Sequence, residues 1–315
     1  MRLERTALRR LARPVENNNK YGCGEYRIDS LPLSKSVVRR RRQTAINPNN
    51  PGLKKMINIK WLTLPAIALL CCTTGASAKE WKELRFGVNP SYPPFESTTA
   101  DGGVQGFGVD LGNAICAELK VKCVWVSNDF DGLIPALKAG KFDAIESSMT
   151  VTDARKKQID FTDRLYAGPT AIVTRKDSGL LPTAESLQGK TIGYMQGTIQ
   201  ETYAKAKLAP GGVKLRAYQN QDQVYADLVF GRLDASIQDK MQAQMSFLTS
   251  PQGADFKNSE GISDPLVPSD IAIGVRKDNE ELKGMLNTAI KALHDKGIYA
   301  QIQQKHFGDL DLYNY

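Results

Sequence analysis

From residue 84 onward, apolar positions alternate between two spacings along the chain. Residues 84–89 alternate apolar and polar side chains as a strand does, and residues 109–119 carry apolar side chains at helical spacing. Strands are predicted again at residues 124–126 and 142–147, with a helix at residues 133–139 between them. Because parallel strands need crossover connections, this order predicts an α/β fold with parallel sheets.

A second series of the same kind follows a predicted crossing strand at residues 171–175. Its predicted elements are strands at residues 191–195, 213–218 and 233–237 and helices at residues 198–201 onward, 221–230 and 240–248. Two series of this kind predict two lobes. Ligands of such sheets bind outside the carboxyl ends of the strands, so a cleft is expected where the lobes face each other.

The C-terminal elements do not complete the second series. They are a strand at residues 271–275 and helices at residues 280–294 and 298–306, and we expect them to return to the first lobe. The predicted boundaries are therefore residues 79–167 and 267–315 for the first lobe and residues 168–266 for the second.

Basic residues are concentrated in the first quarter of the chain. The 315 residues contain 42 Lys and Arg against 34 Asp and Glu, a formal charge of +8. Residues 1–78 hold 15 of these basic and 4 of these acidic residues, so residues 79–315 hold 27 and 30 and carry −3. The folded part is therefore not expected to bind nucleic acid, despite the four arginines at residues 39–42.

The first 78 residues have the features of a leader followed by a secretory signal. Residues 1–55 are polar without a sustained apolar period, and we expect them to be disordered or, if translation starts at Met56, not translated. Residues 56–78 combine lysines, an apolar run of about a dozen residues and a final Ala-Ser-Ala. The run is shorter than the roughly 20 apolar residues of a membrane-spanning helix. We therefore expect export, with cleavage after Ala78.

Two cysteines, Cys116 and Cys123, remain after that cleavage. A helix end and the following strand could bring them together, and export makes a disulfide plausible, while the alternative is two small buried apolar residues. His294 and His306 lack ligand spacing to these cysteines, so no metal site is expected. Both histidines fall in the C-terminal amphipathic helices, where we expect surface positions.

Residues 146–155, Glu-Ser-Ser-Met-Thr-Val-Thr-Asp-Ala-Arg, form the motif with the clearest chemistry. The order is the polar end of a strand, a turn and the start of a helix, for which Thr152 is the expected N-cap. Free N–H groups at a helix start attract an anion, and Arg155 adds a two-pronged donor that matches a carboxylate. The alternative is a surface pair between Arg155 and an acid. The motif predicts a carboxylate receptor.

Six motifs in a fixed order extend this prediction to the whole folded part. They occupy residues 89–97, 106–111, 133–137, 147–155, 196–201 and 231–239. Together they resemble the periplasmic amino-acid-binding proteins of ABC transport systems, solute-binding protein family 3, and within it the lysine/arginine/ornithine- and histidine-binding group. The resemblance implies a type II periplasmic-binding-protein fold with a two-strand hinge. It also implies a monomer without a cofactor that delivers a free amino acid to an inner-membrane ABC permease and is not an enzyme.

The resemblance also implies which residues bind the charged groups of the ligand. Its carboxylate would bind Arg155 and the backbone N–H groups of Thr150 and Thr198. Its ammonium would bind Asp239, the Thr150 hydroxyl and the Ser148 carbonyl. A zwitterion that leaves water needs both charges matched, which supports this assignment. Asp239 can also be the N-cap of the next helix, and the two roles are compatible.

The ligand side chain would bind beside aromatic rings. The resemblance places Tyr92 and Phe130 there, where a ring face attracts a cationic group, although Phe130 alone has the features of a core residue. Further candidates for this part of the site are Ser147, Met195, Gln200 and Asn89, and Gly197 is a further predicted ligand-binding residue.

Asn89 stands where cation-binding members of the group usually carry an acid. Its amide removes the most direct counter-charge for a lysine or arginine tail. Glu146 could compensate, but strand alternation sends Glu146 and Ser147 to opposite faces, so we expect Glu146 to be peripheral. A cationic or polar ligand is expected, with histidine, arginine, ornithine, lysine and opine-like derivatives all open.

Two other functions fit the same fold. An exported small-acid lyase, such as a cyclohexadienyl dehydratase, would need a general acid or base in the cleft, for which Glu96, Glu146 and Asp239 are candidates. A ligand-sensing domain that contacts a membrane receptor is the other alternative, and no sequence feature separates it from a transport protein.

Overall fold

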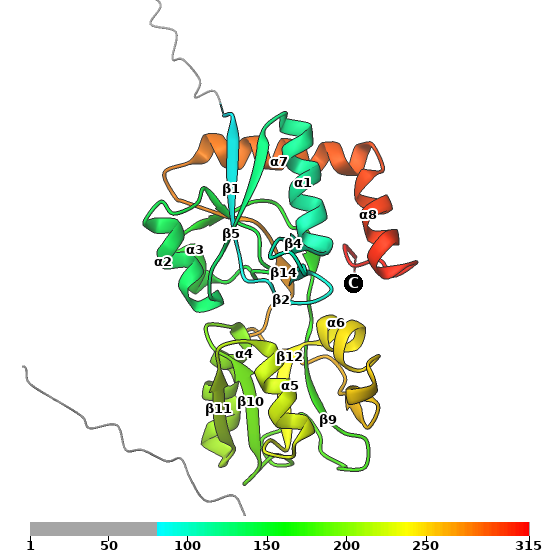
Figure 1. The fold of residues 1–315 in the computed structure, drawn as a ribbon. Coiled ribbons are helices and arrows are strands. Elements are labelled where there is room, and N and C mark those ends of the chain that lie inside the picture. Colours follow the sequence, from blue (N-terminus) through cyan, green and yellow to red (C-terminus); the bar gives the residue numbers. More distant parts are fainter. Residues whose placement is uncertain (1–80, 315) are drawn as a thin grey trace, which may run out of the picture. The chain divides into compact units, whose positions relative to one another are not determined.

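The computed structural model describes residues 81–314. The predicted leader and signal lie outside these residues. Within them the chain forms two five-stranded sheets in two lobes, which are linked by two crossing segments (Figure 1). The predicted two-lobed α/β fold is therefore confirmed.

The first lobe is built on a sheet with the order β5-β1-β6-β15-β7. Its strands are β1 (Glu83–Val88), β5 (Lys122–Ser127), β6 (Ala144–Ile145), β7 (Asp160–Phe161) and β15 (Gly274–Val275). β1 is parallel to β5 and β6, whereas β15 is antiparallel to both of its neighbours. The C-terminal part of the chain thus returns to this sheet as expected.

Helices cover both faces of this sheet. One core contains apolar residues of α1 (Phe107–Leu119), α7 (Glu280–Asp295) and α8 (Ile298–Phe307), and the other contains those of α2 (Leu133–Lys138). The short helix α3 (Asp153–Lys156) follows β6. A small sheet of β2 (Ser91–Tyr92), β3 (Glu96–Thr98) and β4 (Val104–Gln105) lies between β1 and α1 in the sequence.

The second lobe is built on a sheet with the order β11-β10-β12-β9-β13. Its strands are β9 (Thr170–Arg175), β10 (Thr191–Met195), β11 (Lys214–Tyr218), β12 (Ala235–Asp239) and β13 (Phe256–Asn258). β10 is parallel to β11 and β12, while β9 is antiparallel to β12 and β13.

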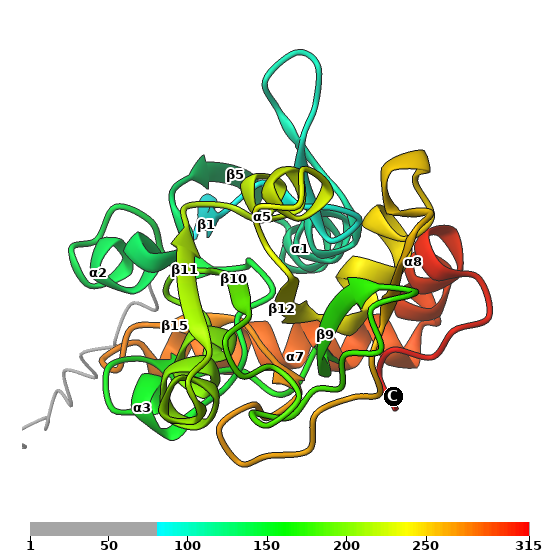
Figure 2. The ribbon, with the colours of Figure 1, turned by 90° about the horizontal axis from the view of Figure 1, so that it is seen from below.

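Alternation along β9 supplies both cores of the second lobe. Ile172 packs with α4 (Ile199–Tyr203), and Val173 packs with α5 (Gln221–Val229) on the opposite face. Figure 2 shows α5 on one side of the strands β9 to β12. The remaining elements are α6 (Lys240–Gln242), π-helical turns at Ala204–Leu208 and Ala243–Phe247, and 3-10 turns at Phe130–Gly132, Ala209–Gly211 and Pro251–Gly253.

Two antiparallel strands connect the lobes. β8 (Tyr166–Ala167) leads into the second lobe, and β14 (Asp270–Ile271) returns from it and pairs with β8. They form the expected hinge. The exact lobe boundaries at residues 167/168 and 266/267 remain predictions.

The single strand predicted at residues 271–275 is wrong, because the chain changes sheets there. Ile271 pairs with Tyr166 in the hinge, whereas Gly274 pairs with Ile145 in the main sheet. The helix predicted at residues 240–248 is likewise divided into α6 and a π-helical turn. None of the helices within residues 81–314 is long and apolar enough to cross a membrane.

The predicted disulfide joins Cys116 near the end of α1 to Cys123 in β5. Lys120 ends α1 in a left-handed conformation, with φ of 57°, and the Val121 N–H then donates to the Cys116 carbonyl. This turn brings the two Cα atoms to 5.7 Å.

Removal of this disulfide should destabilise the protein by about 2–3 kcal/mol, because it closes a short loop in the unfolded chain. Urea unfolding of the oxidised protein and of the Cys116→Ala/Cys123→Ala variant measures the difference. A reducing agent should lower the stability of the parent and leave that of the variant unchanged. Equal unfolding midpoints for parent and variant would contradict the expectation.

Candidate functional site

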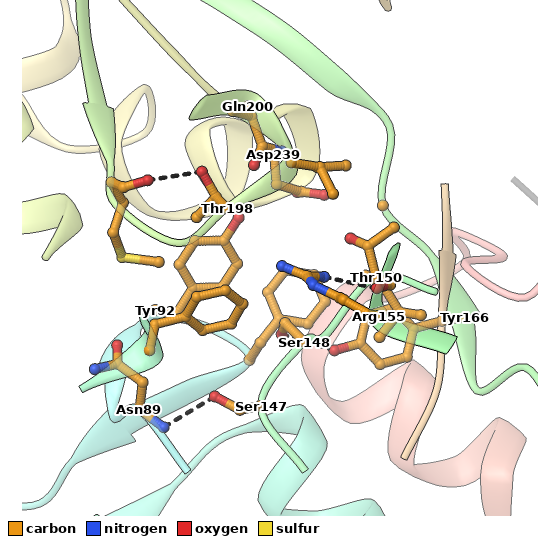
Figure 3. A pocket seen from close by; sticks show the side chains of 16 residues that line it. Asn89, Tyr92, Ser147, Ser148, Thr150, Arg155, Tyr166, Thr198, Gln200 and Asp239 are labelled. Carbon is orange, nitrogen blue, oxygen red and sulfur yellow. Dashed lines mark hydrogen bonds between the residues drawn. The ribbon is translucent and has the colours of Figure 1, made fainter. Parts of the chain in front are cut away.

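A pocket lined by 16 residues lies between the two lobes (Figure 3). Eleven of the predicted ligand-binding residues line it, namely Asn89, Tyr92, Phe130, Ser147, Ser148, Thr150, Arg155, Met195, Thr198, Gln200 and Asp239. The twelfth, Gly197, is outside this lining. The structure therefore brings together predicted residues that are up to 150 positions apart in the sequence, from Asn89 to Asp239.

Arg155 is held in the pocket by the start of α3. The Thr152 side chain caps this helix by accepting from the Arg155 N–H, as predicted. Arg155 Nη1 donates to the Thr150 carbonyl at 2.6 Å, and Nη2 donates to the Gly197 carbonyl of the second lobe at 3.0 Å. The guanidinium carbon is 5.5 Å from the ring centroid of Phe130. These contacts fix the side chain but leave its charge without a counter-ion.

The charge of Arg155 is buried and unpaired within residues 81–314. The residue is 8% exposed and forms no salt bridge there. Burial lowers its pKa to about 10, so the guanidinium remains protonated at neutral pH. The alternative of a surface ion pair is thus wrong.

Asp239 supplies the opposite charge from the second lobe. It is the last residue of β12 and caps α6, with Oδ1 accepting from the Gln242 N–H at 2.7 Å. It is 5% exposed and has no basic partner in the described part of the chain. Burial raises its pKa to about 7, and backbone hydrogen bonds from Gln242 and Met241 oppose that rise.

Two glycines allow close approach around these charges. A Cβ on Gly168 would lie 2.4 Å from Asp239 Oδ2, and one on Gly197 would lie 2.8 Å from the Asp131 Cα atom. Gly197 also has a φ of 78°, which favours glycine. Its contribution is backbone space and a carbonyl for Arg155 rather than a place in the pocket wall.

The helix that begins after Thr198 has a variant of the predicted capping box. Thr198 Oγ1 accepts from the Glu201 N–H and donates to the Met195 carbonyl at 2.7 Å. Glu201 reaches back to the N–H of Gly197, one residue earlier than in the usual box. This arrangement fixes the start of α4 at the pocket.

The part of the pocket around Asn89 is polar but uncharged. Asn89 is 5% exposed, its N–H donates to Ser147 Oγ at 2.9 Å, and its Nδ2 donates to the Asn128 carbonyl. Its Oδ1 is buried without a hydrogen-bond partner among the described residues. At the other end of the pocket, beside Asp239 (Figure 3), Gln200 Nε2 donates to Thr170 Oγ1 at 2.9 Å. Arg155 and Asp239 are the only charged residues in the lining.

Glu146 is peripheral to the pocket, as predicted. The residue points away from the pocket, as strand alternation required, but that direction leads into the lobe, where Glu146 is 1% exposed. Both of its carboxyl oxygens lack a hydrogen-bond partner within residues 81–314. A Cβ on Gly108 would lie 2.6 Å from Glu146 and 2.7 Å from Glu96, so the two carboxyls are neighbours. Burial raises the pKa of Glu96 to about 8 and that of Glu146 well above its usual value.

The prediction that the two histidines lie at the surface is wrong. His306 is partly buried, with Nε2 2.7 Å from Asp110 Oδ2. His294 is partly buried and stacks on Tyr299 at 4.2 Å between ring centroids. His306 therefore joins α8 to α1, and His294 joins α7 to α8. Within the described residues, no group of three or more His, Cys, Asp or Glu side chains is arranged to bind a metal ion.

The pattern for bacterial extracellular solute-binding proteins, family 3, matches residues 84–309. The chain belongs to this family. Family 3 relatives include the histidine-binding periplasmic protein of Escherichia coli, 39% identical over 83% of this chain and 99% of the relative. The lysine/arginine/ornithine-binding periplasmic protein of E. coli is 41% identical over 80% of this chain and 97% of the relative. Both are named as binding proteins, which favours that function over a dehydratase.

A solved structure in the family agrees with the fold. An ancestral arginine-binding protein bound to arginine is 34% identical and superimposes with a TM-score of 0.68 over 72% of this chain and 99% of that protein.

Sequence reasoning missed five residues of the lining, Phe95, Tyr166, Gly168, Ile199 and Ile271. Phe95 and Ile199 belong to the motifs at residues 89–97 and 196–201, so a local signal was present. Tyr166, Gly168 and Ile271 lie in or beside the hinge, and their contact with the pocket depends on how the lobes are joined.

Proposed function

We propose that this protein binds a free amino acid with a cationic or polar side chain in the periplasm and delivers it to an ABC importer. The observation that carries the proposal is the pair of buried charges, Arg155 and Asp239, that face one pocket without a counter-ion among the described residues. A buried charge without a partner costs several kcal/mol. One zwitterion between the lobes neutralises both.

The contacts proposed for the backbone of the ligand follow from the available donors and acceptors. Arg155 has five N–H donors, and its bonds to the Thr150 and Gly197 carbonyls use two of them. The others can bind the ligand carboxylate together with the backbone N–H groups of Thr150 and Thr198. Asp239, the Thr150 hydroxyl and the Ser148 carbonyl would bind the ammonium.

The names of the relatives support the ligand class. They bind histidine or lysine, arginine and ornithine, and all are compatible with Tyr92 and Phe130 as ring contacts for a cationic or polar tail. The protein is proposed to be secreted with cleavage after Ala78, to remain monomeric and to meet an inner-membrane permease as its partner.

Calorimetric titration of the ligand-stripped mature protein tests the proposal directly. The panel comprises the twenty amino acids, ornithine, citrulline and opines. At least one should bind, and its analogue lacking the α-amino group should bind about 100-fold more weakly, because Asp239 would lose its partner. Equal affinity of a ligand and its deaminated analogue would exclude the proposed clamp.

Arg155→Ala should lower the affinity for every ligand by two to three decades or more. The carboxylate is common to all of the ligands, and a broken buried charge pair costs about 3–5 kcal/mol. Arg155→Lys keeps the charge but not the fork, and should fall between parent and alanine variant. Arg216→Ala is a matched surface control, because Arg216 lies in β11 outside the pocket. Affinity of the Arg155→Ala variant within a few-fold of the parent would show that the carboxylate binds elsewhere.

Arginine affinity should rise about tenfold between pH 6 and pH 8. Free Asp239 has a pKa of about 7, and the ligand ammonium favours its ionised form. Binding below pH 7 must therefore expel a proton, whereas above pH 7 the carboxylate is already ionised. Arginine is the probe because its side chain does not titrate in this range. The Glu96→Gln variant should retain the dependence below pH 7, and a flat profile in the parent would contradict the role of Asp239.

Asn89→Asp should strengthen arginine binding about fivefold or more relative to citrulline, its neutral isostere. The introduced carboxylate would make a charge-assisted hydrogen bond with a guanidinium, which contributes more than a neutral one. Both ligands are titrated against parent and variant at one salt concentration. An unchanged arginine-to-citrulline ratio would show that Asn89 does not contact the ligand tail.

A further inference from the structure

Ser148 has an unusual backbone conformation for a residue with a side chain. Its φ is 47°, and Lys120, which ends a helix, is the only other non-glycine residue with positive φ in residues 81–314. The left-handed region is disfavoured for L-residues by roughly 5- to 30-fold. Ser148 does not end a helix, and it lines the pocket. Some contact must therefore compensate for this conformation.

The hydroxyl of Ser148 is bonded to residues behind the pocket wall. Its Oγ lies 2.9 Å from both carboxyl oxygens of Glu96 and 2.8 Å from the Tyr166 hydroxyl. Glu96 in β3 and Tyr166 in β8 are both fully buried. Figure 3 shows Tyr166 beside Ser148 at the pocket. Glu96 is not part of the lining, so its contact with the pocket wall is the one it makes with Ser148.

Neighbouring residues are fixed by other contacts. Ser147 Oγ accepts from the Asn89 N–H, and the Thr150 carbonyl accepts from Arg155. Glu96 therefore acts on the residue with the strained backbone through the Ser148 hydroxyl and also through a hydrogen bond from the Ser148 N–H.

We propose that Glu96 is a positioning residue for the amino-acid site, because it holds Ser148 in the left-handed conformation that presents the Ser148 carbonyl and the Thr150 N–H to the ligand. This inference rests on the proposed function. It gives the buried acid a task that requires neither catalysis nor direct ligand contact.

The network keeps its hydrogen bonds in either protonation state of Glu96. An ionised Glu96 accepts from Ser148, which in turn accepts from Tyr166. A protonated Glu96 donates to Ser148 Oγ, and the serine proton then turns to Tyr166. The carboxyl of the neighbouring Glu146 has no hydrogen-bond partner within residues 81–314, so it is not bonded to the Ser148 hydroxyl. Glu146 is therefore a matched control as a second buried carboxyl.

The decisive comparison is between Ser148→Ala and Ser148→Gly. Both variants lose the hydroxyl, so Glu96 and Tyr166 lose the same hydrogen-bond partner in each. Only glycine adopts positive φ without a steric cost. With L-arginine and L-histidine as calorimetric probes, Ser148→Gly should bind about 5- to 30-fold more tightly than Ser148→Ala. Equal affinities of the two variants would overturn the proposal, whatever happens to Glu96.

A double-mutant cycle then tests the path from Glu96. Glu96→Ala should weaken binding in the parent, and Glu96→Gln, which can still bond to Ser148, should bind several-fold more tightly than Glu96→Ala. In the Ser148→Gly background the cost of Glu96→Ala should largely disappear. An equal cost in both backgrounds would overturn the path through Ser148, and a purely structural role would lower the melting temperature without this coupling.

Further controls distinguish a failure of the proposed function from a failure of this inference. Glu146→Gln should leave affinity within about threefold of the parent, as expected for a residue without contact to the site. If Glu96→Ala does not fold, Glu96→Leu, which keeps the volume but cannot bond to Ser148, replaces it in the cycle. If the parent binds no member of the amino-acid panel, the proposed function fails and this inference with it; if it binds only another member, that ligand replaces the two probes. Normal binding with additive Glu96 and Ser148 effects would reject the inference alone.

Discussion

This structure depends on one constraint. It buries two charges of opposite sign, and neither has a counter-ion within the described residues. Arg155 comes from the first lobe and Asp239 from the second, and each is fixed by backbone groups rather than by a counter-ion. Within the described residues, the protein therefore supplies no counter-ion for either charge. Because they lie on two lobes, a single zwitterion can neutralise both only where the lobes meet, so the proposed ligand would contact both lobes at once.

The rest of the pocket can be understood as support for these charges. Helix starts at Asp153 and Ile199 direct N–H groups into the pocket region, and the caps Thr152 and Thr198 fix where those helices begin. The bond between Arg155 and the Gly197 carbonyl crosses from one lobe to the other, so the same guanidinium that would bind a carboxylate also stabilises the approach of the lobes. Glycine at 197 and 168 keeps the backbones close enough for this.

Local signals in the sequence were sufficient for the caps, the charges and most of the fold, because a cap or a strand end depends on a few adjacent residues. They were insufficient wherever a side chain's surroundings come from distant segments. Alternation gave the correct direction for Glu146 but not its depth, since the space behind β6 is filled by β3 and α1. The apolar run at residues 271–275 carries no sign that Ile271 pairs in the hinge and Gly274 in the main sheet. Tyr166 and Ile271 enter the pocket for the same reason.

Buried acids in this protein serve different ends according to their hydrogen bonds. Asp239 accepts from two backbone N–H groups, which favour its ionised form and keep it near the point of titration despite its burial. Glu96 is bonded to the Ser148 hydroxyl, which can donate or accept, so its environment tolerates either state, and Glu146 has no hydrogen-bond partner within residues 81–314 that would favour ionisation. Negative charge is thus concentrated at Asp239, where the proposed ammonium binds, and withheld from the region of Asn89. A ligand tail there would be selected by hydrogen bonds and aromatic faces, without a carboxylate as counter-ion. The two ends of the pocket therefore differ in charge, because Arg155 and Asp239 are ionisable whereas Asn89 is neutral.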